Sequence, residues 1–596
     1  MTFQSDQKYI AEMLSHKGAK FIIPPYQRPY KWGIDECETL WNDILNAFRE
    51  NEGSKNEYFL GSIIAFSDSN FKNKFQIIDG QQRITTFTLL FRAFYECFEK
   101  EEKKGDYPRE FGSCVWEYVN NKGLEFTEQH LQSEVATDRE KENLSQILSE
   151  KIDEKLLEED NKKIKNNRSH YVQNYLYFLE KLRSFKGDQS NSWGEFCNFV
   201  LEQNLFVLFV VCDSQESAMT IFNTLNSRGM PLSNADVLKG YLYKHYKEQG
   251  NIDGFIDQWS EIETNIESVG SNKDVNLDFL FLQYMHIIRA ANKDFNTTTI
   301  KFLDFFTSKD EFKKIGNKKI QIWGSSQKWL YKDETMPFIA LLADFWLRPQ
   351  YYLCGKSLYY IKVLSIFQNK GWKSFVSCLV WKYKELLFQK NIDKNAISQS
   401  FEAALLELLQ KISLLFLRLE ATSNKIDQLV FKLNANLLNN EAITKEIDEI
   451  PYPSFETFIE NMWENRANKA KYLLYLYAYV YDDFSQPIDV DDLQVEHILP
   501  KRWQNANFNG WDEESHKKYL EQIGNKILLP SASNRACLEN FFAQKKTEYA
   551  KSANDHLKEV QDLAKLPQND WLKEDIEKRN EEIYTRLKSF FTSNVS

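Results

Sequence analysis

The chain lacks several features that would assign it to common classes of protein. Its eight cysteines are scattered over 596 residues and include no C-x₂-C pair. This spacing argues against zinc knuckles and disulfides and predicts reduced core cysteines in a cytoplasmic protein. No uninterrupted apolar run of about 18 residues occurs, so no membrane span is expected. The first residues also lack the basic region and apolar run of a signal peptide.

A surplus of positive charge is missing as well. The chain has 75 Lys and Arg against 86 Asp and Glu, which gives a formal net charge of −11. A negative net charge is unusual for a nucleic-acid-binding protein, but local patches rather than net charge contact phosphates. The hydrophobic content of 42% and charged content of 27% are those of a globular protein. The length predicts about two to four domains.

What the chain does contain is an ordered set of polar residues near its C-terminus. Glu496 and His497 lie in LQVEHILPKRW, and IGNKILLP follows with Asn525. These short apolar runs predict a small hairpin, with Asn525 on its second strand. The next segment, ASNRACLENFFAQKKTEYAKS, predicts a helix whose polar start carries Asn534. We expect the three pieces to converge on one divalent cation, because Glu496 and Asn534 offer oxygen ligands.

This arrangement predicts metal-assisted phosphodiester hydrolysis. His497 would take a proton from water while the cation, Mg²⁺ or Mn²⁺, stabilises the leaving oxygen. Asn525 would hold the imidazole or its backbone in register, so His497, Asn525 and Asn534 form the predicted catalytic set. The residues predicted to contact DNA around this set are Lys501, Arg535, Lys545 and Lys546. The alternative is a buried histidine in an ordinary hairpin, with asparagines as turn and cap residues.

A second polar cluster interrupts the apolar pattern of the N-terminal half. The run FQII ending in Asp79-Gly80 predicts a strand and a tight turn. The residues with helical spacing after it are Ile84, Phe87, Leu90, Phe91 and Phe94. The turn and helix start are Asp79, Gly80, Gln81, Gln82 and Arg83. A helix N-terminus favours phosphate, and Arg28 and Arg228 lie in two further polar breaks. We expect the three segments to converge on an anion, although DGQQR as a mere turn with capping residues is the alternative.

The C-terminal motif resembles a known nuclease domain. Residues 496–551, with GNKILLPSASNRACLENFF, are similar to an HNH (ββα-metal) nuclease domain. The resemblance implies that Glu496 and Asn534 take the metal positions, His497 the general base and Asn525 the supporting position. Many family members have Asp where this chain has Glu496, whose longer side chain can still bind a metal ion.

The N-terminal motifs resemble a second family. YQRPYKW, DGQQR and FNTLNSRG together resemble the N-terminal domain of the GmrSD family of modification-dependent (type IV) restriction enzymes. That domain is ParB/sulfiredoxin-like, and the resemblance implies that DGQQR binds and hydrolyses a nucleotide, ATP, GTP or another NTP. Arg28 and Arg228 would then contact its phosphates.

The sequence therefore predicts an α+β, predominantly helical protein with three domains. Residues 1–245 would form a ParB-like nucleotide-binding sensor, 246–480 a helical connecting bundle and 481–596 the HNH nuclease domain. The predicted function is a cytoplasmic, nucleotide-dependent DNA endonuclease of antiphage defence that cleaves or nicks modified phage DNA. The predicted assemblies are a homo-oligomer or a complex with a companion defence protein. The alternatives are a nucleotide-gated DNA-binding clamp and an NTPase switch acting through a partner protein.

Overall fold

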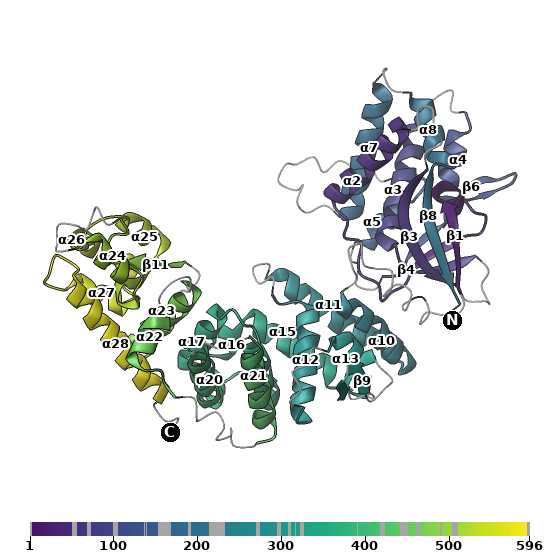
Figure 1. The fold of residues 1–596 in the computed structure, drawn as a ribbon. Coiled ribbons are helices and arrows are strands. Elements are labelled where there is room, and N and C mark those ends of the chain that lie inside the picture. Colours follow the sequence, from purple (N-terminus) through teal and green to yellow (C-terminus); the bar gives the residue numbers. More distant parts are fainter. Residues whose placement is uncertain are drawn as a thin grey trace. The chain divides into compact units, whose positions relative to one another are not determined.

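The structure is a computed structural model, and it divides the chain into two compact units, Met1–Ser260 and Glu261–Ser596 (Figure 1). The residues that it describes are 3–50, 57–67, 73–98, 105–135, 138, 140–152, 169–188, 192–213, 218, 233–269, 274–294, 300–307, 312–315, 318–321, 327–389, 391–417, 423–440, 451–461, 467–488, 492–502 and 511–592. Within them, no helix is long and apolar enough to cross a membrane.

The first unit is built on a mixed six-stranded sheet in the order β1-β8-β3-β4-β2-β7. Its strands are β1 (Phe3–Tyr9), β2 (Lys20–Ile23), β3 (Tyr58–Phe66), β4 (Lys74–Asp79), β7 (Leu131–Ser133) and β8 (Leu205–Cys212). The pairs β1–β8 and β3–β4 are antiparallel, whereas β8–β3, β4–β2 and β2–β7 are parallel. A separate hairpin pairs β5 (Trp116–Val119) with β6 (Gly123–Gln129).

Both faces of this sheet are covered. The helices of the unit are α1 (Ile10–Leu14), α2 (Ile34–Glu50), α3 (Gln81–Phe98), α4 (Tyr107–Ser113), α5 (Lys141–Ile147), α7 (His170–Gly187), α8 (Trp193–Leu201), α10 (Asn234–Glu248) and α11 (Ile252–Ser268), the last of which crosses the boundary between the units. Successive strand residues face opposite sides, so Ile63 joins the main core with α2, α3 and α7, while Ile64 joins a smaller cluster with Tyr26. Helices α2, α3 and α7 lie together beside the sheet in Figure 1.

The strand, turn and helix predicted around DGQQR are confirmed. Strand β4 ends at Asp79 and α3 begins at Gln81. The expected apolar stripe is buried along its whole length, at Ile84, Phe87, Leu90, Phe91 and Phe94. The polar motif is therefore fixed between a core strand and a core helix.

The second unit is mostly helical. Its first part contains α12 (Leu277–Ala291), α13 (Phe302–Thr307), β9 (Phe312–Ile315), β10 (Lys318–Gln321), α14 (Gln327–Leu330), α15 (Thr335–Leu347), α16 (Pro349–Tyr352), α17 (Gly355–Ile366), α18 (Trp372–Lys382), α19 (Lys384–Leu387), α20 (Lys394–Leu417), α21 (Ser423–Leu438), α22 (Phe455–Asn461) and α23 (Ala467–Tyr481). Its second part contains β11 (Leu493–His497), α24 (Glu513–Leu520), η3 (Ile523–Asn525), β12 (Lys526–Pro530), α25 (Ser531–Cys537), α26 (Phe542–Tyr549), η4 (Ser552–Asn554), α27 (Lys558–Ala564) and α28 (Lys573–Thr592). The protein is thus α+β and mostly helical, as predicted.

The connecting helices and the C-terminal elements pack as one body. Helix α23 contacts β12, α27 and α28, and the Tyr475 hydroxyl donates to the Leu493 carbonyl over 3.2 Å. Gln410 on α20 donates to the carbonyl of Phe590 on α28 over 2.7 Å. The division into compact units accordingly places residues 261–480 in one unit with 481–596, whereas 246–260 belong to the first unit.

Candidate functional site

Glu496 and His497 end a strand whose partner carries the second half of the site. Strands β11 and β12 pair antiparallel, with His497 opposite Lys526 and Glu496 opposite Ile527. The connection between the strands contains α24 and η3, so the pair is not a tight hairpin. Asn525 is the last residue of η3 rather than part of the second strand, which corrects its predicted placement.

The helix expected after β12 is two helices. Helix α25 ends at Cys537 and α26 begins at Phe542. Between them Leu538 has φ +41°, a conformation that a leucine cannot adopt within a right-handed helix. Asn534 therefore lies on a short helix that contacts β11 and β12.

Glu496 is buried and paired. Its side chain is 7% exposed, and its Oε1 atom lies 2.6 Å from Nζ of Lys545, which is 1% exposed. The same ammonium donates to the backbone carbonyl of His497 over 2.5 Å. Burial raises the pKa of Glu496, although the Lys545 charge opposes that shift. Lys545 is therefore buried and does not lie on the predicted DNA-contacting surface, because its ammonium pairs with the buried carboxylate of Glu496.

His497 is paired with a carboxylate that the sequence did not reveal. Its Nε2 atom lies 3.2 Å from Oε1 of Glu521, and Oε2 of Glu521 lies 2.6 Å from Nζ of Lys526. Burial lowers the pKa of His497, although Glu521 opposes the shift. The His497 and Lys526 contacts lower the pKa of Glu521 to about 2. At neutral pH the site therefore holds a neutral imidazole beside an ionised carboxylate, the state that a general base requires.

Asn525 positions the backbone on both sides of the histidine pair. It is fully buried, and its Oδ1 accepts from the N–H of Leu499 over 2.8 Å. Its Nδ2 donates to the carbonyl of Leu520, next to Glu521, over 2.8 Å. One amide therefore ties the loop after His497 to the end of α24. These contacts are those of a positioning residue that does not touch a reacting group.

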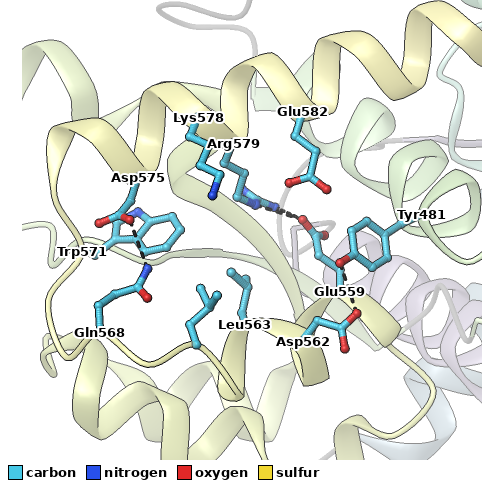
Figure 2. A pocket seen from close by; sticks show the side chains of 11 residues that line it. Tyr481, Glu559, Asp562, Leu563, Gln568, Trp571, Asp575, Lys578, Arg579 and Glu582 are labelled. Atoms are coloured by element: carbon cyan, nitrogen blue, oxygen red, sulfur yellow. Dashed lines mark hydrogen bonds and ion pairs between the residues drawn. The ribbon is translucent and has the colours of Figure 1, made fainter.

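Helix α28 holds η3 and the start of β12 in place through hydrogen bonds. The Arg579 guanidinium donates to the carbonyls of Ile523, Gly524 and Lys526 over 2.7–3.2 Å. Arg579 also pairs with Glu559 in the wall of a pocket between α27 and α28 (Figure 2). None of the predicted site residues lines this pocket. Its walls therefore serve as a scaffold for the β12 side of the candidate site.

The donors available to a cation are oxygen atoms. Nδ2 of Asn534 donates to Gln494 over 3.0 Å, which leaves its carbonyl oxygen as the possible ligand. Among the residues described, no group of three or more His, Cys, Asp or Glu side chains forms a metal site. Glu496 and Asn534 offer the kind of oxygen atom that Mg²⁺ prefers, and Oε1 of Glu496 is also the atom paired with Lys545.

Of the other predicted DNA contacts, two are exposed. Lys501 and Arg535 face solvent. Lys546 is half-buried and donates to the carbonyls of Leu566 and Gln568 over 2.9 Å and 2.6 Å. Its ammonium thus holds the loop before α28, and Lys501 and Arg535 are the cations of the predicted set that can reach a phosphate without breaking such bonds.

In the first unit, Gln82 joins two of the three predicted segments. Its Oε1 accepts from the N–H groups of Lys31 and Trp32 over 2.8 Å and 3.1 Å, and its Nε2 donates to the carbonyl of Pro29 over 3.2 Å. The loop that carries Arg28 is thereby fastened to the start of α3. Arg228 lies outside the described residues.

Asp79 and Arg83 form the charged part of this second site. Burial raises the pKa of Asp79, while the Gly80 N–H and the charges of Arg83 and Arg28 oppose the shift. Arg83 donates to the carbonyl of Ser62 over 2.7 Å. Its guanidinium lies against Gly61, because a Cβ atom added to that glycine would lie 2.9 Å from Cζ of Arg83. The sequence reasoning missed Gly61 and Ser62, which lie on β3 with no motif of their own.

Gly80 is expected to tolerate no side chain. Its φ is +86°, and an added Cβ would lie 2.9 Å from Cγ1 of Ile63 and 3.1 Å from the Ser62 carbonyl oxygen. We predict that Gly80→Ala destabilises the first unit by about 1–3 kcal/mol. Gly123→Ala is the matched control, because Gly123 has φ +87° and nothing within 4 Å of its Cβ position. Equal unfolding midpoints in urea for the two variants would contradict the role assigned to this close approach.

Two family descriptions match the chain. Residues 10–243 match the description "GmrSD restriction endonuclease, N-terminal domain". Residues 452–586 match "GmrSD restriction endonucleases, C-terminal domain". The second match begins before α22 and includes α23, in agreement with the packing of α23 on β12. No curated protein matches the chain.

Proposed function

The chain belongs to the GmrSD restriction endonuclease family, and on that premise we propose how it cuts DNA and what controls the cut. Membership implies a DNA endonuclease that acts on modified DNA. The proposed activity is nucleotide-dependent cleavage or nicking of modified phage DNA by metal-assisted hydrolysis. The nuclease chemistry is assigned to the β11–β12 site, and its control to NTP bound and hydrolysed at DGQQR.

The observation that carries the nuclease assignment is the pairing of His497 with Glu521 at the end of β11. A neutral imidazole there accepts the proton of a water molecule as the water oxygen forms a new bond to phosphorus. The bond from phosphorus to the leaving oxygen then breaks. A bound Mg²⁺ or Mn²⁺, held by Glu496 and Asn534, would stabilise the negative charge on the phosphate and leaving oxygens. Lys501 and Arg535 hold the DNA backbone from the exposed side.

The support for a nucleotide is the start of α3. Gln81 is 6% exposed, and its Nε2 has no hydrogen-bond partner among the described residues. A buried donor of this kind is costly unless a ligand satisfies it. Helix N-termini bind phosphate through backbone N–H groups, and Arg28 and Arg83 add positive charge beside Asp79. We therefore assign NTP phosphates to this position.

Gln81→Leu tests that assignment directly. If Gln81 only fills the core, removal of an unsatisfied polar group leaves stability unchanged or improved and affects nothing else. If Nε2 donates to a charged phosphate, NTP affinity falls by about 10- to 100-fold, the equivalent of roughly 1.5–3 kcal/mol. Binding is measured with a fluorescent NTP analogue. Unchanged affinity in a stably folded variant would remove Gln81 from the nucleotide site.

The whole function is tested by cleavage of matched DNAs. Unmodified, glucosyl-hydroxymethylated and phosphorothioated versions of one sequence are incubated with the full chain, with Mg²⁺ or Mn²⁺ and with or without each NTP. The expected result is cutting of a modified DNA that requires the cation and an NTP. NTP hydrolysis with no cutting of any DNA would favour the switch that acts through a partner protein. Cutting that is indifferent to NTP would contradict the control assigned to DGQQR.

A further inference from the structure

The ionised state of Glu521 decides which ring nitrogen of His497 carries hydrogen. Glu521 contacts Nε2 of His497 through one oxygen and the Lys526 ammonium through the other. A carboxylate so paired accepts hydrogen bonds and has no proton to donate. The hydrogen of the 3.2 Å contact must therefore lie on Nε2. In a neutral imidazole, the lone pair then belongs to Nδ1.

Nδ1 is the ring nitrogen that no described residue contacts through a hydrogen bond. It is buried and has no hydrogen-bond partner within the part of the chain that the structure describes. Buried polar atoms are nearly always satisfied, and an exception in a candidate site calls for a functional explanation. A donor on Nδ1 would occupy the lone pair, and the described residues provide none.

From these two observations we infer that Glu521 is a positioning residue that fixes the Nε2–H tautomer of His497, and that Nδ1 is the atom that receives the proton of the attacking water. The inference rests on the proposed nuclease function. In the step, the water O–H bond breaks, its proton goes to Nδ1 and its oxygen bonds to phosphorus. The bond from phosphorus to the leaving oxygen breaks, and its electron pair stays on that oxygen. The ring becomes an imidazolium that the Glu521 carboxylate stabilises, as carboxylates do for histidine bases elsewhere.

Two features of the fold hold His497 and Glu521 together. Lys526 lies directly across the β11–β12 ladder from His497, so both side chains project from the same face and share Glu521. Glu521 follows α24, whose last carbonyl, on Leu520, is bonded to Asn525. Its side chain is nevertheless 44% exposed, so a substitution there removes little buried surface.

The test uses the full chain and has a readout that does not depend on cleavage. Nitrogen-15 NMR of histidine-labelled protein reports which ring nitrogen is protonated, and His497→Ala identifies the signals of that ring. We expect a protonated Nε2 in the wild type, and in Glu521→Gln a shift towards protonated Nδ1. Glu334→Gln is the matched control, because Glu334 is 41% exposed and its two carboxylate oxygens pair with Lys332 and Lys384, which are not part of the candidate site. A wild-type ring with its proton on Nδ1 would overturn the inference.

Kinetics supply the second readout. Glu521→Gln is expected to lower kcat by about 10²- to 10⁴-fold with little change in KM, by analogy with the wrong-tautomer effect in a catalytic triad. Because Glu521→Gln leaves the Lys526 charge unpaired, the double variant Glu521→Gln with Lys526→Met guards against a folding defect. If both variants kept the wild-type kcat and His497→Ala were inactive, the role of Glu521 would be refuted and the proposed nuclease function would stand. A wild-type chain that carries the Nε2 proton but cuts no modified DNA would instead refute the proposed nuclease function, and with it the proton transfer to Nδ1.

Discussion

His497→Ala is expected to lower kcat for cleavage of modified DNA by about 10²- to 10⁴-fold, the usual contribution of a general base. The imidazole is neutral at neutral pH because burial lowers its pKa. Its removal deletes the proton acceptor while the exposed cations Lys501 and Arg535 stay in place. Affinity for the same DNA, measured by fluorescence anisotropy without divalent cation, should therefore be unchanged.

His556→Ala is the control for this substitution. His556 is a half-buried histidine of the same unit, and it has no role in the proposed chemistry. Its variant should cleave at the wild-type rate. Cleavage by His497→Ala at the rate of His556→Ala would show that another group takes the proton.

Lys545→Met is expected to destabilise the site rather than to weaken DNA binding. The substitution leaves the Glu496 carboxylate buried without its partner, and breaking a buried ion pair in this way costs about 3–5 kcal/mol. The hydrogen bond to the His497 carbonyl is also lost. Hydrogen exchange of the β11 and β12 amides, followed by mass spectrometry, reports the free energy of local opening and should accelerate strongly.

Two further variants separate burial from surface charge. Lys551→Met removes an exposed ammonium close to the end of α26, paired with Glu548, and should leave exchange unchanged. Glu496→Gln combined with Lys545→Met removes both buried charges and should recover much of the loss, because no unpaired charge remains. If Lys545→Met weakens DNA binding without faster exchange, the surface role first predicted for Lys545 would be restored.

The sequence was sufficient where local pattern and local structure coincide. The change from strand to helical spacing at DGQQR predicted β4, the turn at Gly80 and the buried stripe of α3. The apolar runs around His497 and Asn525 likewise predicted the β11–β12 pair. Within each of these strands and helices, residues that are close in sequence determine the element, so periodicity and turn chemistry contain the information.

The sequence did not predict which side chains from distant segments would pair with each other. Lys545 looked like one more surface lysine, and only the packing of α26 on β11 shows that it neutralises Glu496. Glu521 lies in a loop with no motif, and only the β11–β12 register and the end of α24 bring it to His497. The break at Leu538 also escaped prediction, since leucine rarely adopts a positive φ and nothing in its local sequence indicates one.

By itself, the sequence determined the family, the α+β and mostly helical class, and the residue types of two polar sites. The tertiary structure decided the electrostatics of those sites. It assigned one lysine to a buried carboxylate, gave the histidine an ionised partner and left one glutamine donor at a helix start without a partner among the described residues. Residue identity fixes which charges a chain carries, whereas burial and pairing fix which of them remain available for chemistry.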